Sequence, residues 1–203
     1  MMSQAYFNDR APIWDRTAAE KDHARLQDMA RRLGLRPGAK VLDVGAGTGV
    51  LLPFLLKEIG SSGRIFALDF AELMLRQALS KNTDGSVAYL LADISHIPAR
   101  PASFDAVVCY SSFPHFPDKP RTLAEISRTM KPGGRLLICH TGSREHINRI
   151  HRGIPAVRED LLPDETEMRR MLAAAGFTDI VIEDGSDSYF VAAERPAYGN
   201  TKS

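Results

Sequence analysis

A glycine-rich segment near the start of the chain has the composition of a ligand-binding loop. Residues 41–50 read VLDVGAGTGV, with Gly45, Gly47 and Gly49 at alternate positions. Glycine removes the Cβ atom where backbone passes close to a ligand, and it permits positive φ. A helix that begins after such a loop offers N–H groups to a negatively charged ligand group. The segment therefore predicts a binding loop, although the glycines could also serve only to shape a tight connection.

Two residues of this segment distinguish between ligands. The dinucleotide-binding fingerprint has Gly or Ala at its sixth position, which is Val50 here. Asp43 lies just before the glycines, where its carboxylate would repel a pyrophosphate but attract an ammonium group. The sequence also has no recognisable Tyr/Lys set for hydride transfer. These residues count against an NAD(P)-dependent oxidoreductase, which is therefore kept only as an alternative hypothesis.

Alternating strand-like and helix-like segments are expected to position this loop. Nearly continuous apolar runs, such as Ala106–Cys109, are typical of parallel strands that are covered on both faces. Their alternation with amphipathic segments predicts a doubly wound, mostly parallel α/β sheet. A hairpin signal at residues 183–187 predicts that the last two strands pair antiparallel. The seven predicted strands are Lys40–Val44, Arg64–Asp69, Val87–Ala92, Phe104–Tyr110, Arg135–Cys139, Phe177–Ile182 and Tyr189–Ala193. The predicted helices are Thr17–Leu33, Gly49–Ile59, Ala71–Ser80, a helix from the Asp118 cap to Met130, and one that starts at Pro163 and stops at Gly176, and Lys131–Gly134 is a predicted turn.

Polar residues follow successive predicted strands. In an open α/β sheet, ligands bind beyond the carboxyl ends of the strands, and Asp43, Asp69, Asp93 and Tyr110 all fall there. Each aspartate alone could be a helix cap or a turn residue. Together they predict a polar ligand site at this end of the sheet.

Segments in register along most of the chain carry a family resemblance. They are the opening at residues 6–15, the glycine loop, residues 65–74, Leu91–Ile94, Phe104–Val108 and Lys131–Leu136. In this order they resemble the class I S-adenosylmethionine-dependent methyltransferases, especially the small-molecule branch that includes methyltransferase domain 11. The resemblance implies a Rossmann-like methyltransferase fold and transfer of a methyl group from S-adenosylmethionine to an unidentified small molecule. A non-catalytic protein that only binds the same cofactor is the further alternative.

The resemblance also implies roles for particular residues. Asp69 would bind both ribose hydroxyls, Met74 would lie near the adenine, and Asp93 would meet the adenine amine while Ile94 packs on the ring. The cofactor has an amine and a carboxylate at its methionine end, which suits Asp43 and the glycine loop. The full set of expected cofactor-binding residues is Asp43, Gly45, Ala46, Gly47, Thr48, Gly49, Asp69, Phe70, Met74, Asp93, Ile94 and Ser111.

Three residues after the fourth and fifth predicted strands are candidates for the chemistry. Methyl transfer from a sulfonium needs alignment and exclusion of water, and an oxygen or nitrogen acceptor can need a base. His115 is the first candidate for a base or a substrate contact, His140 is the second, and Tyr110 lies where the methyl group is expected. A lone histidine can equally bind or pack. No metal is expected, because His146 and His151 are spaced poorly for one helical face.

Composition narrows the setting of this chemistry. The 203 residues include 26 Lys and Arg against 25 Asp and Glu, so a nucleic-acid partner is not expected. Two cysteines and no apolar run of membrane-spanning length predict a cytoplasmic protein. We expect one methyltransferase domain over residues 1–203, with 1–33 as a helical cap and 141–162 as a substrate-side insertion. The expected partner is a small-molecule substrate, and a homodimer is left open.

Overall fold

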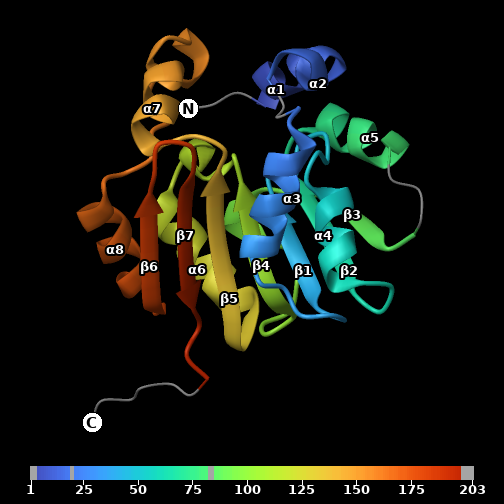
Figure 1. Ribbon diagram of the computed structural model, residues 1–203, viewed down its shortest axis with the longest axis vertical. Coiled ribbons are helices and arrows are strands. Elements are labelled where there is room, and N and C mark those ends of the chain that lie inside the picture. Colours follow the sequence, from blue (N-terminus) through green and yellow to red (C-terminus); the bar gives the residue numbers. More distant parts are fainter. Residues whose placement is uncertain (1–3, 19–20, 82–84, 198–203) are drawn as a thin grey trace.

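One mixed β-sheet organises the molecule. The computed structural model describes residues 4–18, 21–81 and 85–197. Within them the strand order is β3-β2-β1-β4-β5-β7-β6 (Figure 1). Only β7 runs antiparallel to its neighbours, β5 and β6, which confirms the predicted doubly wound sheet and its C-terminal hairpin. The strands are β1 (Lys40–Val44), β2 (Arg64–Asp69), β3 (Val87–Leu91), β4 (Phe104–Tyr110), β5 (Met130–His140), β6 (Thr178–Asp184) and β7 (Tyr189–Glu194).

Helices cover both faces of this sheet. Buried residues of α6 and α8 pack on one face, and those of α3 and α4 pack on the other. The central strands are therefore buried on both sides; in β1, Val41, Leu42 and Val44 have no exposed surface. This explains the absence of apolar–polar alternation in their sequence. The helices are α1 (Gln4–Arg10), α2 (Trp14–Thr17), α3 (His23–Arg32), α4 (Leu52–Ile59), α5 (Glu72–Lys81), α6 (Lys119–Thr129), α7 (Arg144–Arg152) and α8 (Glu165–Ala174), with short 3₁₀ turns η1 (Ala11–Ile13), η2 (Ile94–His96), η3 (Phe113–His115) and η4 (Pro155–Val157).

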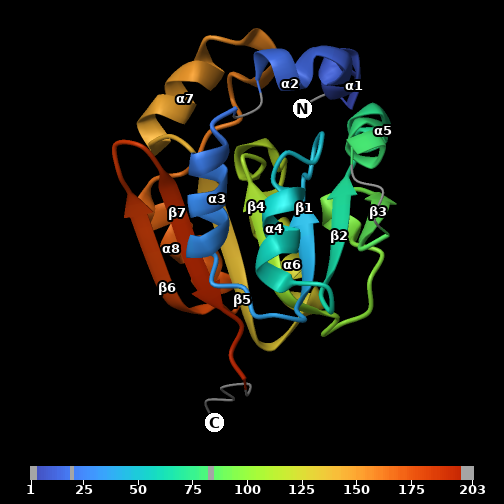
Figure 2. The ribbon, with the colours of Figure 1, turned by 45° about the vertical axis from the view of Figure 1, so that its right-hand side comes forward.

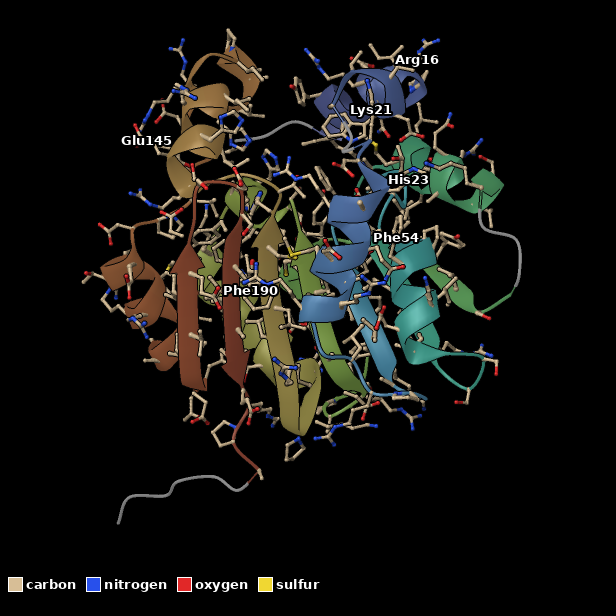
Figure 3. The ribbon with its side chains drawn as sticks, viewed as in Figure 1. Arg16, Lys21, His23, Phe54, Glu145 and Phe190 are labelled. Carbon is tan, nitrogen blue, oxygen red and sulfur yellow. The ribbon has the colours of Figure 1, made fainter. Side chains whose placement is uncertain are left out.

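The first long helix starts later than the sequence predicted. We expected Thr17–Leu33, of which residues 19 and 20 lie outside the described residues, but α3 begins at His23. Asp22 accepts hydrogen bonds from the N–H groups of Ala24 and Arg25 at 2.9 and 3.2 Å, and this cap fixes the helix start. Contacts at both ends then hold α3. The ring centres of His23 and Phe54 lie 5.8 Å apart (Figure 3). The Arg32 guanidinium lies 4.5 Å from the ring centre of Phe190.

Three other predicted boundaries were wrong by a few residues. The helix expected at Gly49 begins at Leu52, because Gly49 has φ +75° and belongs to the preceding loop. The helix expected at Pro163 begins at Glu165, because Asp164 is its cap and accepts from the N–H of Glu167 at 2.8 Å. The expected turn at residues 131–134 lies within β5, with an irregular register against β4.

Short helices from two distant parts of the sequence lie beyond the carboxyl ends of the strands. Figure 2 shows α1, α2 and α7 together at this end of the molecule. Phe7 of α1 is buried in a small cluster with Ala71 and Met74, which ties the N-terminal segment to the α5 region. Residues expected to form a cap and an insertion therefore cover the end of the sheet where ligands bind in this architecture.

Candidate active site

A cavity of about 700 Å³ opens beyond the carboxyl ends of the central strands. Its walls come from the glycine loop, the ends of β2 and β4, the turn after β3, α1, α2 and α7. A volume of this size holds a cofactor-sized ligand. Of the residues expected at the site, those that line the cavity are Gly45, Ala46, Gly47, Thr48, Asp69, Phe70, Met74, Asp93, Ile94, Tyr110, Ser111 and His115.

The three glycines of the loop have different surroundings. A Cβ on Gly45 would lie 2.4 Å from Cβ of Ser112, so this glycine lets the loop pass close to the turn after β4. A Cβ on Gly49 would meet Leu52 and Ala78 at 2.8 and 3.0 Å, so this glycine serves helix packing and lies outside the cavity lining. A Cβ on Gly47 would meet no protein atom within 4 Å. Gly47, with φ +54°, is therefore the position at which the backbone faces open space for a ligand.

The carboxylate of Asp69 is held in place by backbone donors. Its Oδ2 accepts from the Gly47 N–H and its Oδ1 from the Ala71 N–H, both at 2.8 Å. Burial raises the pKa of this carboxyl, and the backbone hydrogen bonds oppose that rise. Backbone donors, including that of Phe70, leave part of the carboxylate's accepting capacity free, so Asp69 can still accept from a sugar hydroxyl. The same contacts fix the glycine loop relative to β2.

Asp43 lies beneath the loop rather than in the cavity wall. It is 2% exposed, and burial together with the charge of Asp69 raises its pKa to about 7. By strand alternation it shares the sheet face of Val41, under α3 and α4. Asp43 is not among the residues that line the cavity, and its predicted role toward an ammonium group stays a prediction.

The turn after β3, residues 92–94, supplies a further part of the cavity wall. Asp93 Oδ1 accepts from the Ser95 N–H at 2.8 Å and caps η2, which leaves Oδ2 for a ligand amine. Ile94, Phe70 and Met74 are apolar neighbours in the lining. This combination of a carboxylate and a flat apolar surface matches what a purine ring with an exocyclic amine requires.

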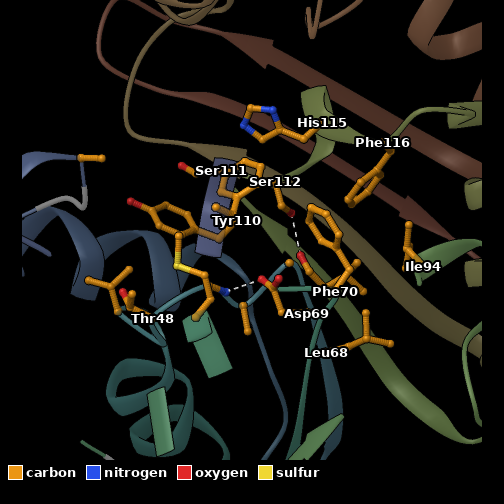
Figure 4. A pocket seen from close by; sticks show the side chains of 18 of the residues that line it. Thr48, Leu68, Asp69, Phe70, Ile94, Tyr110, Ser111, Ser112, His115 and Phe116 are labelled. Carbon is orange, nitrogen blue, oxygen red and sulfur yellow. Dashed lines mark hydrogen bonds between the residues drawn. The ribbon is translucent and has the colours of Figure 1, made fainter. Parts of the chain in front are cut away.

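His115 and the turn that holds it form the side of the cavity after β4. Figure 4 shows His115 with Tyr110, Ser111 and Ser112 around the open space. Ser112 Oγ donates to the Val44 carbonyl at 2.6 Å, and Ser111 adopts φ +52°, so this turn is tied directly to β1. The His115 Nδ1 atom lies 3.0 Å from Oδ2 of Asp160. A histidine paired with a carboxylate at a ligand cavity can act in proton transfer.

Comparisons with known proteins agree with this geometry. The family model described as "Methyltransferase domain" matches residues 42–138, which span β1 to β5. The chain belongs to the class I S-adenosylmethionine-dependent methyltransferases. A solved S-adenosylmethionine-dependent methyltransferase from Aquifex aeolicus superposes with a TM-score of 0.71 at 25% identity, over 96% of this chain and 100% of that one.

Two curated relatives place this methyltransferase chain more closely. A ubiquinone/menaquinone biosynthesis C-methyltransferase UbiE from Bordetella avium is 38% identical over 53% of this chain and 43% of its own length. A demethylmenaquinone methyltransferase from Lactiplantibacillus plantarum is 35% identical over 68% of this chain and 62% of its own length. The chain thus spans about half the length of the curated relatives that it matches. The comparisons give no support to an oxidoreductase or to a non-catalytic binding protein.

The residues present fit the cofactor of this methyltransferase family. Gly47 leaves backbone space in the loop, Asp69 can still accept from a ribose hydroxyl, and Asp93 with Ile94 suits an adenine. Among the described residues there is no group of three or more His, Cys, Asp and Glu side chains that could hold a metal ion. Cys109 and Cys139 are both buried free thiols, and they belong to core clusters on opposite faces of the sheet. In the described part of the chain, no helix is long and apolar enough to cross a membrane.

The surroundings of two candidate site residues, His140 and Thr48, differ from what the sequence predicted. His140 is 2% exposed and lies outside the cavity lining, where burial lowers its pKa to about 3. A neutral imidazole at that depth does not exchange protons with a ligand in the cavity. Thr48 lines the cavity, but its hydroxyl donates to Asp15 of α2 at 2.5 Å. Asp15 also accepts from Lys81 at 2.7 Å, so one carboxylate joins α2, the loop and α5.

Sequence reasoning missed Asp15 and Asp160 as functional residues. Asp15 lies 33 residues from its partner Thr48, and Asp160 lies 45 residues from its partner His115. No local spacing connects residues so far apart. The one available signal was that residues 6–15 and 141–162 were expected on the substrate side, where acids and histidines could meet.

Proposed function

We propose that this protein transfers the methyl group of S-adenosylmethionine to a small apolar molecule, at an acceptor atom that becomes nucleophilic by losing a proton to His115. The observation that carries the proposal is the position of His115, which lines the cavity while its Nδ1 atom lies within hydrogen-bonding distance of Asp160. The name of one curated relative describes a C-methyltransferase of ubiquinone and menaquinone biosynthesis, and the name of the other describes a methyltransferase that acts on demethylmenaquinone. A carbon acceptor activated by a neighbouring hydroxyl group fits both observations.

The lining on the acceptor side supports an apolar molecule. Away from the glycine loop and the two aspartates, the wall consists largely of apolar side chains from α1, α2, the turn after β4 and α7, namely Phe7, Trp14, Phe116, Pro117, Ile147 and Ile150. Such a surface gains free energy by burying an aromatic or aliphatic body, at about 25 cal/mol per Å². Phe7 and Trp14 belong to the predicted cap, residues 1–33, and Ile147 and Ile150 belong to the predicted substrate-side segment, residues 141–162. We propose that both segments bind the acceptor.

The protein's part in the reaction is positioning and proton transfer. When bound, S-adenosylmethionine supplies an electrophilic methyl group with a neutral leaving group. The chain aligns the acceptor against it and keeps water out, which can contribute several kcal/mol. A phenol or enol is a weak nucleophile until its hydroxyl proton leaves. A positioned base in contact with that hydroxyl contributes about 10²- to 10⁴-fold.

Methyl transfer to a panel of acceptors tests the proposal. Phenols and dihydroxynaphthalenes with an unsubstituted carbon beside the hydroxyl are expected to be methylated, whereas aliphatic amines and carboxylic acids are not. Mass spectrometry and NMR of the product locate the methyl group on carbon or oxygen. His115→Gln is expected to lower kcat at least 100-fold, while calorimetry shows unchanged affinity for S-adenosylhomocysteine.

A matched variant separates loss of the base from general damage. His96 is an exposed histidine outside the cavity lining, so His96→Gln is expected to keep full activity. Activity in His115→Gln equal to that of His96→Gln, or turnover of amines only, would overturn the proposed acceptor chemistry. A cytoplasmic location and a homodimer are finer proposals, which cell fractionation and light scattering of the purified protein would check.

A further inference from the structure

Asp160 contacts two histidines through two different groups. Its side-chain Oδ2 lies 3.0 Å from Nδ1 of His115, and its backbone carbonyl bonds to Nδ1 of His151. The two imidazoles are stacked, with ring centres 4.8 Å apart and planes at 27°. Phe7 contacts His115 edge-on, with the ring centres 5.4 Å apart. One residue therefore contacts both rings, of which His115 lines the cavity.

The segment that carries Asp160 is itself held rigidly. Asn148 of α7 is 2% exposed and bonds twice to Leu162, donating to its carbonyl at 2.9 Å and accepting from its N–H at 2.8 Å. The Asp160 N–H donates to the Val157 carbonyl at 3.0 Å, which places Asp160 just after η4. The aspartate is thus fixed from both sides along the chain, so its carboxylate can define the position of a neighbouring ring.

The acceptors on Asp160 determine which nitrogen of each ring carries a proton. An ionised carboxylate and a backbone carbonyl only accept hydrogen bonds, so each neutral imidazole must donate from Nδ1. The proton-free nitrogen of each ring is then Nε2. For His115 this leaves a basic lone pair on the nitrogen that Asp160 does not occupy.

We propose that Asp160 is the positioning residue of the reaction, which holds His115 in the Nδ1–H form so that Nε2 takes the proton of the acceptor. This inference rests on the proposed function. The acceptor O–H bond breaks, its proton forms the Nε2–H bond of an imidazolium, and Asp160 stays ionised and bound to Nδ1. The acceptor carbon bonds to the methyl carbon as the methyl–sulfur bond breaks. The imidazolium then returns its proton to the acceptor oxygen, and the hydrogen still carried by the methylated carbon leaves to water as a proton.

The groups around the pair are compatible with this role. His151 is the nearest second base, but burial lowers its pKa, so it stays neutral and does not repel a protonated His115. Lys119 of α6 donates to the carbonyls of Pro114 and Phe116 at 2.8 and 3.2 Å and thereby holds the turn that carries His115. The carboxylate of Asp69 also interacts electrostatically with His115. His140 is neutral, because burial lowers its pKa to about 3.

Histidine NMR tests the inference without any acceptor. In the ¹⁵N-labelled, full-length protein near neutral pH, the neutral form of His115 is expected to show a protonated Nδ1 and an unprotonated Nε2. Asp160→Asn should shift His115 toward the Nε2–H form, since an amide N–H can donate to Nδ1. Glu159→Gln removes the same charge at the exposed neighbouring residue and should leave the tautomer unchanged. A wild-type His115 in the Nε2–H form would overturn the inference even if no variant folds.

Kinetics then separate this inference from the proposed function. With an acceptor that the wild type methylates, Asp160→Asn should lower kcat about 10- to 100-fold, part of what a general base contributes. The affinity for S-adenosylhomocysteine should stay within twofold, and Asp160→Glu should recover part of the rate. Unchanged kcat in Asp160→Asn would overturn the role of Asp160. Failure of every hydroxylated acceptor would overturn the proposed function, whereas the tautomer would still be decided by NMR.

Discussion

The buried carboxyl of Asp43 should make the stability of this protein fall as the pH rises through neutrality. Burial and the nearby charge of Asp69 raise its pKa from 3.8 to about 7. A carboxyl with a raised folded-state pKa binds a proton more tightly in the folded chain than in the unfolded chain. Its ionisation therefore opposes folding at every pH above its unfolded-state pKa, and the penalty grows until the pH exceeds the folded-state pKa.

The size of this penalty follows from the two pKa values. Their difference of about 3 corresponds to about 4 kcal/mol of unfolding free energy once both states are ionised. The penalty is only partly developed at pH 5, and the same linkage gives a further loss of about 2.5 kcal/mol between pH 5 and pH 8. Because a domain is stable by about 5–15 kcal/mol in total, this change is large enough to measure.

Asp43→Asn removes the titration while keeping the side-chain size. We expect the unfolding free energy of the wild type to decline relative to that of Asp43→Asn by about 2.5 kcal/mol from pH 5 to pH 8. Urea denaturation without cofactor at several pH values measures both curves, and the comparison cancels groups that titrate alike in the two proteins. The exposed Asp187→Asn should follow the wild-type curve. Parallel curves for the wild type and Asp43→Asn would refute the reasoning.

Two further substitutions test other buried contacts. Burial lowers the pKa of His140 to about 3 in the folded chain, whereas its pKa in the unfolded chain is about 6.5. Through this residue the wild type should lose about 2 kcal/mol of unfolding free energy between pH 7.5 and pH 5, and His140→Phe should abolish that loss in urea denaturation. The same loss in both proteins would contradict this. Asp15→Asn weakens the hydrogen bonds of α2 to Thr48 and Lys81. Amide hydrogen exchange in residues 4–17 should become about fivefold faster, as expected for the loss of about 1 kcal/mol. An exchange rate equal to that of the exposed Asp9→Asn variant would contradict this.

The positions of the proposed cofactor-binding residues were predictable because the information that places them is local. The strand that ends at Val44, the glycines after it and the acids at the ends of β2 and β3 each follow a short pattern in the sequence. Parallel pairing of β1 with β2, and of β2 with β3, brings these strand ends to one edge. The glycine pattern did not reveal that Gly49 serves packing while Gly47 faces open space, because that depends on Ala78 of α5.

The histidine candidates show where local patterns stop being informative. His115 and His140 each follow a strand, and nothing in their neighbouring residues separates them. The structure distinguishes them by surroundings: His115 lines the cavity beside Asp160, whereas His140 is buried outside the lining. How deeply a histidine is buried depends on segments elsewhere in the sequence, so it cannot be derived from the strand that precedes the histidine.

The two halves of the site are therefore encoded in different ways, and this has a consequence for specificity. Asp69 and Gly47 are bonded to each other, so the cofactor half is fixed by the sheet and its first loop. His115 obtains its carboxylate partner from Asp160, and an edge-on ring contact from Phe7, neither of which belongs to the sheet. Changes in residues 141–162 can alter the surroundings of His115 without touching the contact between Asp69 and Gly47, whereas residues 4–18 also reach the loop through the Asp15–Thr48 hydrogen bond. An acceptor specificity built in this way can vary among proteins that share one cofactor site.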